Sequence, residues 1–372
     1  MKKRRAIEAV VATPALALAR FTLALSLNLS GPVFAQLPAR EIRYTSVLDF
    51  LKLPPDLYLG EAAGVAVNSK GHIFVLSRGN TNGPAYGAGA TQLLEFAPDG
   101  KFIREIGHHL YAWSFAHSVK IDKDDNIWVA DKGSDMVIKF TSEGRVVMVF
   151  GRKQEASDEG TAALKHVRPP LPPVDGMFRQ VTDVTWDSTG NTYISDGYIN
   201  SRIAKVDRDG NWLKSWGEPG DQPGQFNVPH SIAMDAHDNL YVADRGNRRI
   251  QVFDTDGKFL RQFTIDVAVD PNARPAIGFK PTQMTGTMAP GAPWAICITP
   301  GPNQVLYSSD AFPGRIYKLT LDGKILGVFG QAGKQLKQFG WIHEMACPVE
   351  NELYVSELLN WRVQKLILQP SH

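Results

Sequence analysis

Residues 230–246, HSIAMDAHDNLYVADRG, contain the pattern that decides the fold. Apolar and polar positions alternate on both sides of a turn rich in Asp and Asn, and β-branched and aromatic residues are frequent. Alternation with a period of two around a polar turn predicts an antiparallel hairpin of two β-strands. The second strand ends in an acid, Asp244, which serves as a fixed point for comparison with other segments.

The same pattern recurs five more times, and each copy is followed by further strand-forming segments. The other instances are GVAVNSKGHIFVLSRG (64–79), HSVKIDKDDNIWVADKG (117–133), TDVTWDSTGNTYISDGY (182–198), AICITPGPNQVLYSSDA (295–311) and HEMACPVENELYVSELL (343–359). Six units of four strands predict an all-β fold, a six-bladed β-propeller, because radial repetition buries each sheet face against the next blade.

The sixth unit ends after its third strand, so its fourth strand must come from elsewhere. Residues 41–50, EIRYTSVLDF, form an expected strand without a partner before the first repeat. We expect this strand to complete the last blade, so that residues 36–372 form one propeller domain with repeats from about 60 to 366. The Pro-rich segments 152–178 and 264–292 interrupt the period and are expected to be loops inserted between blades.

The first 35 residues have the features of a secretory signal peptide. Four cations stand in the first five residues, an apolar stretch is densest from Phe21 to Leu29, and Val33-Phe34-Ala35 precedes Gln36. We expect cleavage after Ala35 and a protein that is exported, either periplasmic or secreted. The alternative is a retained membrane anchor, although Arg20 interrupts the apolar stretch and the run after it is too short to cross a bilayer.

The charge balance argues against a nucleic-acid partner. The 372-residue chain has 40 Lys and Arg against 38 Asp and Glu, a net charge of +2. Residues 1–35 contain five basic residues and one acid, so their removal leaves 35 against 37, a net charge of −2. Nucleic-acid recognition needs a basic surface, which this composition does not supply. We expect a monomer without a transmembrane span, and the sequence leaves open whether Cys297 and Cys347 pair.

Three histidines occupy one column of the repeat. The reference position at the end of the second strand is an acid in blades 2 to 6 and Ser77 in blade 1. Fourteen residues before it, blades 2, 4 and 6 have a histidine and blades 1, 3 and 5 have another residue: His117, His230 and His343, against Ala63, Thr182 and Ile296. First strands line the channel of a propeller, so the three imidazoles are expected to converge. Three histidine ligands without a fourth protein ligand are typical of catalytic zinc, while copper, iron and nickel remain alternatives.

The loops that follow the second strands are expected at the same end as the histidines, because the first two strands of a blade form a hairpin. This places the following residues near the metal: Arg78, Lys132, Tyr198, Arg245, Phe312 and Leu358. Arginine suits a carboxylate or carbonyl, and a tyrosine near a cation can act as a general base. The acids themselves recur in nearly every blade and are therefore expected to support the scaffold: Asp131, Asp196, Asp244 and Asp310.

The repeats resemble NHL repeats, and residues 60–366 resemble the catalytic propeller of peptidyl-α-hydroxyglycine α-amidating lyases. The stretches that carry this resemblance most specifically are VTDVTWDSTGNTYISDGYINSRI (181–203) and GQFNVPHSIAMDAHDNLYVADRGNRRIQVF (224–253). The resemblance implies zinc as the cofactor and the following site residues: His117, His230 and His343 as zinc ligands, Tyr198 as the catalytic tyrosine, and Arg78 and Arg245 as the active-site arginines.

The resemblance also implies a structural calcium, held by the backbone carbonyls of Val65 and Val119 and by an acid after the third histidine. That acid is Glu344 here, where the family has Asp, and Trp341 stands where the family has Met. These two departures change the shape of the expected site.

The expected function is therefore that of an exported zinc-dependent lyase acting on a small-molecule or peptide amide. Such an enzyme would cleave the C–N bond of an N-(α-hydroxyalkyl) amide to give an amide and an aldehyde such as glyoxylate. One alternative is a non-catalytic NHL propeller that binds a protein or glycan and holds a structural metal. Another is a calcium-dependent hydrolase of the lactonase propeller type, which would need Asp, Asn and Glu in the channel.

Overall fold

The structure is a computed structural model that describes residues 39–79, 91–154 and 171–369. The predicted signal peptide and much of the first inserted loop, residues 155–170, lie outside the described residues. Gln36–His372 form one compact unit. Within the described segments, no helix has the length and apolar character needed to cross a membrane.

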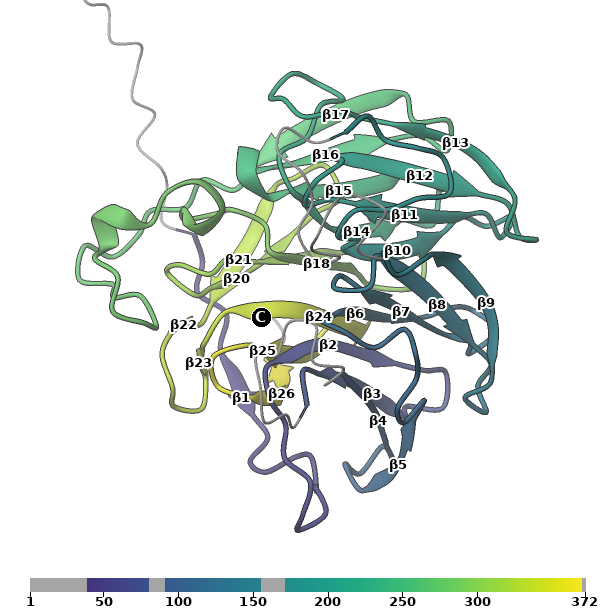
Figure 1. Cartoon of the computed structure of the whole chain (residues 1–372). Coiled ribbons are helices and arrows are strands. Elements are labelled where there is room, and N and C mark those ends of the chain that lie inside the picture. The colour runs from purple at the N-terminus through teal and green to yellow at the C-terminus, as the bar shows by residue number, and fades with distance from the viewer. Residues whose placement is uncertain (1–38, 80–90, 155–170, 370–372) are drawn as a thin grey trace, which may run out of the picture. The chain divides into compact units, whose positions relative to one another are not determined.

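Six four-stranded antiparallel sheets form the blades (Figure 1). Blade 1 contains β2 (Ala62–Val67), β3 (Ile73–Ser77), β4 (Gln92–Phe96) and β5 (Phe102–Ile106), and blade 2 contains β6 (Ala116–Ile121), β7 (Ile127–Asp131), β8 (Met136–Phe140) and β9 (Val146–Gly151). Blade 3 contains β10 (Asp183–Trp186), β11 (Thr192–Asp196), β12 (Arg202–Val206) and β13 (Trp212–Trp216), and blade 4 contains β14 (Pro229–Met234), β15 (Leu240–Asp244), β16 (Arg249–Phe253) and β17 (Phe259–Thr264).

Blade 5 contains β18 (Ala295–Ile298), β19 (Leu306–Ser309), β20 (Ile316–Leu319) and β21 (Ile325–Phe329), and blade 6 contains β24 (Ile342–Val349), β25 (Glu352–Glu357) and β26 (Arg362–Leu368). The fourth strand of blade 6 is β1 (Tyr44–Ser46), which runs antiparallel to β26 with Tyr44 opposite Leu368. The predicted all-β, six-bladed propeller is thus confirmed, including its closure by an N-terminal strand. That strand is shorter than the expected 41–50.

Short elements fill the connections between blades. The segment between blades 5 and 6 contains a small parallel pair, β22 (Gln331–Ala332) and β23 (Gln338–Phe339). A 3₁₀ turn, η1 (Arg245–Asn247), follows β15. The second inserted loop contains η2 (Pro281–Gln283) and η3 (Gly286–Met288) and connects β17 to β18.

Hydrophobic clusters join neighbouring blades among the described residues. Between blades 2 and 3, for example, Trp128 and Phe150 pack with Ile194 and Val206. Burial of one such side chain contributes about 1.5–3 kcal/mol. Because each blade buries both faces in this way, the inner strands are held in fixed positions around the channel.

The turn between the first two strands forms for a local reason that repeats along the chain. In blade 4, the Asp235 carboxylate accepts backbone N–H bonds from His237 and Asn239 at 2.9 and 2.8 Å. The side chain of Asn239 donates to the same carboxylate at 2.8 Å. Asp and Asn stabilise tight turns through such side-chain contacts with the backbone, so the repeated Asp and Asn positions define the hairpins.

The acids that end the second strands support the scaffold, as expected from their recurrence. Asp131 is buried and accepts backbone N–H bonds from Phe115 at 2.9 Å and from Gly133 and Ser134 at 3.0 Å. Asp244 is likewise buried and pairs with Arg249 Nε at 2.8 Å. These bonds fix the loops that begin directly after β7 and β15, where the candidate site residues lie.

Cys297 of β18 and Cys347 of β24 form a disulfide with their Cα atoms 6.2 Å apart. It joins the innermost strands of blades 5 and 6. The pairing that the sequence left open is therefore present in the structure.

Candidate metal centre and active site

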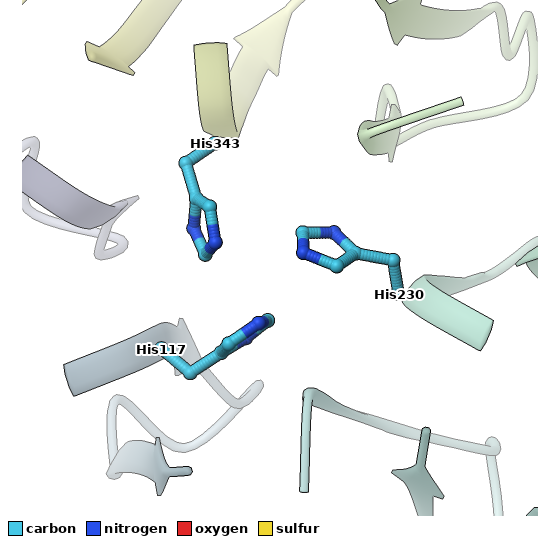
Figure 2. A group of neighbouring side chains, drawn as sticks. All are labelled: His117, His230 and His343. Atoms are coloured by element: carbon cyan, nitrogen blue, oxygen red, sulfur yellow. The ribbon is translucent and has the colours of Figure 1, made fainter. Parts of the chain in front are cut away.

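The three histidines of the repeat column meet at the channel. His117, His230 and His343 are all buried, and their candidate ligand nitrogens lie within 4.8 Å of one another. Figure 2 shows the three imidazole rings turned toward a common point from three blades. Their ring centroids are 4.5 to 4.8 Å apart. Among the described residues, this group could hold a metal ion.

Each histidine occupies the extra residue of a β-bulge. In blade 4, Pro229 pairs with Asp244 and Ser231 pairs with Ala243, so His230 has no partner opposite it. The same register shift occurs around the other two histidines, between Ala116 and Ser118 and between Ile342 and Glu344. A bulge re-aims the side chain of the extra residue, and here it directs each imidazole toward the channel.

The Nδ1 atom of each imidazole contacts a backbone carbonyl of the next blade. The three distances are 2.6 Å from His117 to Thr182, 2.6 Å from His230 to Trp294 and 2.7 Å from His343 to Ala63. A carbonyl can only accept, so Nδ1 carries the proton and donates, which leaves the Nε2 lone pair for a metal. Blades 1, 3 and 5, which have no histidine in this column, thus orient the three histidines of blades 2, 4 and 6.

The protonation state of the three histidines also suits a metal ligand. Burial lowers the pKa of each well below its ordinary value, and neighbouring positive charges such as Arg78 and Arg245 add to this effect. Neutral imidazole is the form that binds metals. The Nε2 atom of His230 is buried without a hydrogen-bond partner in the described chain, and a metal ion would satisfy it. The three residues therefore fit a zinc ion.

Tyr198 lies beside the histidines, on the loop after β11. Its hydroxyl is 3.4 Å from His117 Nε2, and its ring contacts those of His117 and His230 edge-on. Burial alone would raise the pKa of Tyr198. The positive charges of Arg245, Lys132 and Arg78 outweigh burial, so that its pKa is lower than the ordinary value.

The two predicted arginines reach the same region but differ in their contacts. Arg78 donates from Nε to the carbonyl of Ala116 at 3.1 Å and forms an ion pair with Glu61. Arg245 lies with its guanidinium carbon 4.5 Å from the Trp294 ring centroid, and its buried Nε has no hydrogen-bond partner in the described segments. The Nε atom of Arg245 is therefore available to an incoming ligand, although the side chain also hydrogen-bonds to Tyr198, whereas much of Arg78 is already engaged.

Aromatic side chains line the site, and sequence reasoning missed two of them. Trp294 packs against His230 and Trp341, with ring centroids 5.8 and 5.7 Å away, and its Nε1 donates to the carbonyl of Thr287 in the second inserted loop. Phe115 carries the Arg78 guanidinium on its ring face at 3.8 Å. Trp341 stands where the family pattern has Met. Phe115 and Trp294 lie two residues before His117 and Ile296, which are the histidine-column positions of blades 2 and 5. The repeat pattern does not single out this position.

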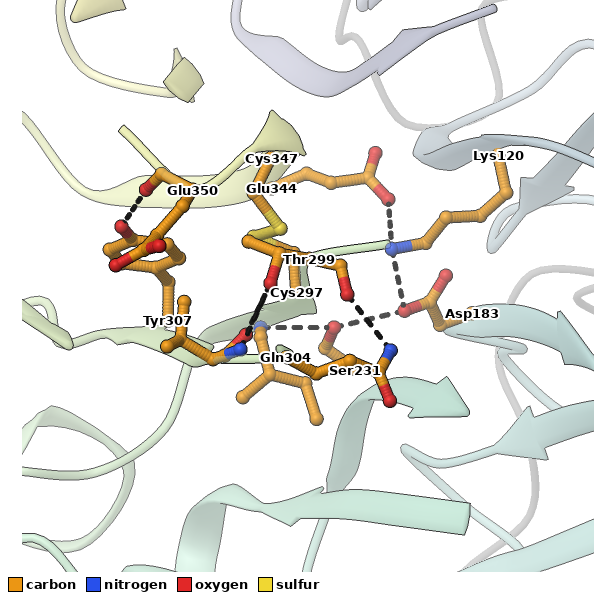
Figure 3. The surroundings of a disulfide bond; sticks show 12 residues. Lys120, Asp183, Ser231, Cys297, Thr299, Gln304, Tyr307, Glu344, Cys347 and Glu350 are labelled. Carbon is orange, nitrogen blue, oxygen red and sulfur yellow. Dashed lines mark hydrogen bonds and ion pairs between the residues drawn. A yellow bond between two sulfur atoms is a disulfide. The ribbon is translucent and has the colours of Figure 1, made fainter. Parts of the chain in front are cut away.

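The resemblance implies that Val65, Val119 and Glu344 surround a calcium ion, but in the structure Glu344 hydrogen-bonds directly to the other two residues. Glu344 accepts the backbone N–H groups of Val65 and Val119 at 3.1 and 3.0 Å, and the Lys120 ammonium lies 3.1 Å from Glu344 and 3.4 Å from Asp183 (Figure 3). The two carboxylates hold the pKa of Lys120 above its ordinary value, although burial acts in the opposite direction. A lysine already supplies the positive charge here, so these residues do not fit a calcium ion.

This lysine belongs to a polar network that links the inner strands. Asp183 accepts the Ser231 hydroxyl and the Ile232 N–H, both at 2.9 Å, and the Ser231 hydroxyl oxygen accepts the Ile296 N–H at 3.3 Å. With Lys120 and Glu344, the network includes residues from all six blades. Neither Lys120 nor Asp183 was predicted, because their role depends on which strands face each other.

Comparisons with known proteins support the sequence-based resemblance. A family model described as NHL repeat matches residues 226–253. The rat protein named peptidylglycine alpha-amidating monooxygenase is 34% identical over 235 residues, which cover 56% of this chain and 22% of the rat protein. A Caenorhabditis elegans protein named probable peptidyl-alpha-hydroxyglycine alpha-amidating lyase pgal-1 is 29% identical, over 54% of this chain and 57% of its own length.

A third relative carries no reaction in its name. The human NHL repeat-containing protein 3 is 33% identical over 215 residues, 54% of each chain. The matches thus span from about a fifth to just over half of these relatives.

Solved structures support the fold alone. A structure of a streptogramin B lyase has a TM-score of 0.52 and 14% identity, covering 88% of this chain and 98% of that one. The selenomethionine-substituted virginiamycin B lyase from Staphylococcus aureus has a TM-score of 0.54 and 14% identity, covering 88% and 100%. The chain is therefore a six-bladed β-propeller that contains an NHL repeat at residues 226–253 and resembles peptidyl-α-hydroxyglycine α-amidating lyases.

Proposed function

We propose that this protein is a metal-dependent lyase that cleaves the C–N bond of an N-(α-hydroxyalkyl) amide. The observation that carries the proposal is the convergence of three buried, neutral imidazoles with Tyr198, whose hydroxyl lies 3.4 Å from His117 Nε2. The similarity to proteins named as amidating lyases supports the same class of reaction. The products would be an amide and an aldehyde, which is glyoxylate when the hydroxylated carbon carries a carboxylate.

The metal that best fits the ligand set is zinc, held by His117, His230 and His343. When bound, it would supply Lewis acidity that lowers the pKa of a substrate hydroxyl. Tyr198 would accept the proton of that hydroxyl, whose oxygen keeps the electron pair and forms the aldehyde C=O. The C–N bond breaks in the same process, and the amide nitrogen takes up a proton. Arg245 and Arg78 would hold the carboxylate and carbonyl through charge-assisted hydrogen bonds.

The test is release of glyoxylate from α-hydroxyhippurate by zinc-loaded protein. We expect benzamide and glyoxylate in equal amounts, and we expect His230→Ala to abolish their release. The exposed His237 provides a matched control, since His237→Ala should retain activity. Wild-type protein that contains zinc but releases no glyoxylate would exclude this substrate class.

We also propose that the protein acts outside the cytoplasm as a monomer. The disulfide between Cys297 and Cys347 supports export, because disulfides persist mainly in oxidising compartments. The expected signal peptide predicts a mature N-terminus at Gln36. Intact-mass analysis of exported protein tests this, and a protein that retains residues 1–35 would contradict it.

A second candidate function is that of a binding module with a structural metal. The observation that favours it is the similarity to the human NHL repeat-containing protein 3, whose name specifies no reaction. Under this alternative, the histidine site would hold a metal without turnover. The glyoxylate assay separates the two candidates.

A further inference from the structure

Lys132 occupies the position in blade 2 that Arg78 has in blade 1 and Arg245 has in blade 4. Each directly follows the last residue of the second strand of its blade. Each also donates its backbone N–H to a loop carbonyl before the first strand, at 3.0, 2.9 and 3.3 Å respectively. The three cationic side chains therefore start from equivalent points around the ring, on the same end as the histidines.

The side chain of Lys132 reaches the candidate active site. Its ammonium lies 3.8 Å from the ring centroid of Tyr198 and 5.5 Å from that of Phe115. The Arg78 guanidinium also lies over the Phe115 ring, and the Tyr198 hydroxyl approaches His117. Lys132 is thus separated from the metal ligands by one aromatic ring.

The three cationic side chains differ in which acidic or accepting groups lie next to them. Arg78 is paired with the partly exposed Glu61, so part of its charge is already neutralised. Arg245 is only 6% exposed, its guanidinium lies over the rings of Trp294 and Tyr198, and its buried Nε has no acceptor among the described groups. A buried charged donor without an acceptor is costly, which points to an anionic ligand as its partner.

The surroundings of Lys132 point to the same conclusion. Burial lowers the pKa of Lys132, the positive charges of Arg78 and Arg245 lower it further, and Tyr198 and Asp135 act in the opposite direction. A cation held near two others gains free energy when an anion binds between or beside them. Lys132 and Arg245 approach Tyr198 from blades 2 and 4, which flank the blade that carries this tyrosine. Two cations from separate blades suit two separate anionic groups.

We propose that Lys132 is a specificity-determining residue that binds a second anionic group, so that the preferred substrates are N-acyl-α-hydroxyglycines with a carboxylate on the acyl part. This inference rests on the proposed function, which assigns the α-carboxylate to Arg245 and Arg78 and the hydroxyl to the metal. The acyl part is then the remaining portion of the substrate that can carry an anion to Lys132.

Two substrates that differ by one carboxylate test the inference. Wild-type protein should show a kcat/KM for 4-carboxy-α-hydroxyhippurate at least tenfold above that for α-hydroxyhippurate, mainly through a lower KM. Lys132→Met should reduce this ratio to about one, and Lys132→Arg should preserve most of it. A matched control is Lys139→Met, because the Lys139 ammonium also lies over an aromatic ring, that of Trp128 at 5.0 Å, but belongs to β8. This control should keep the wild-type ratio.

The outcomes separate this inference from the proposed function. Turnover of both substrates with equal kcat/KM by the wild type would overturn the role of Lys132 and leave the lyase assignment intact. Turnover of neither would overturn the lyase assignment, and calorimetry with unreactive hippurate and 4-carboxyhippurate would then decide on Lys132. Tighter binding of the dianion that is lost in Lys132→Met supports the role, and equal binding by both proteins contradicts it.

Discussion

His343 Nδ1 lies 2.7 Å from the carbonyl oxygen of Ala63, a contact that crosses from the last blade to the first. The orientation of one metal ligand therefore depends on the junction at which the ring closes. The ring is completed by the N-terminal strand β1, which supplies the fourth strand of blade 6 beside β26. We therefore expect closure of the ring and geometry of the metal centre to be coupled.

Weakening β1 should therefore weaken metal binding as well as stability. Tyr44 of β1 packs 4.9 Å from the Phe329 ring and donates its hydroxyl to the carbonyl of Lys337. Because this side chain is half-buried, Tyr44→Ala should lower the free energy of unfolding by about 2 kcal/mol in urea titrations and raise the Kd for zinc. Tyr58→Ala is the control, since Tyr58 is 64% exposed. Unchanged zinc affinity in Tyr44→Ala would show that closure and metal geometry are independent.

Tyr198→Phe should reduce turnover without loss of the metal. Removal of the hydroxyl next to His117 takes away the proposed proton acceptor, and such groups contribute about 10²–10⁴-fold to the rate. We expect kcat for glyoxylate release to fall by about this factor while zinc content stays at the wild-type level. Tyr111→Phe, at a residue 70% exposed, should behave as wild type. A Tyr198→Phe protein with full kcat would assign proton transfer to another group.

Arg245→Lys should weaken substrate recognition although it keeps the charge. A lysine cannot reproduce the planar fork of arginine, and loss of one charge-assisted hydrogen bond of about 1.5–3 kcal/mol corresponds to roughly a 10- to 100-fold lower kcat/KM. Arg248→Lys is a matched control from the next turn, where the side chain pairs with Asp266 at 3.4 Å and is 42% exposed. If both variants lost activity equally, a general effect on the loop would explain the result.

Lys120→Met should destabilise the propeller, because it leaves Asp183 and Glu344 buried without their cation. Removal of one partner from a buried ion pair costs about 3–5 kcal/mol, measured here by urea unfolding. Adding Glu344→Gln should recover part of the loss, since the double variant buries one charge fewer. The exposed Lys101 supplies the control Lys101→Met. Millimolar calcium should leave the wild-type Tm unchanged, and a large increase would contradict the assignment of this charge to Lys120.

The sequence predicted the blades and the histidine column because both depend on local, repeated signals. Strand alternation, Asp and Asn turns and a constant fourteen-residue spacing are properties of one blade at a time. The β-bulges were not predictable from these signals, since a bulge at His230 is defined by how its strand pairs with β15.

The missed contacts share a different physical origin. The contact of His230 with the Trp294 carbonyl and the ion pair between Lys120 and Glu344 both join different blades. Their formation depends on how neighbouring inner strands face one another, which a single repeat does not encode. The residues that the resemblance assigned to calcium also meet across blades, since Glu344 of blade 6 accepts the N–H groups of Val65 and Val119 from blades 1 and 2.

The measurement that tests the central claim most directly is the metal content of purified protein, determined by elemental analysis beside His230→Ala. The account predicts about one zinc per chain in the wild type and in His237→Ala, and only traces in His230→Ala, because two imidazoles alone do not complete the ligand set. Wild-type protein without stoichiometric metal, or His230→Ala with an unchanged metal content, would contradict the metal centre on which the proposed function depends.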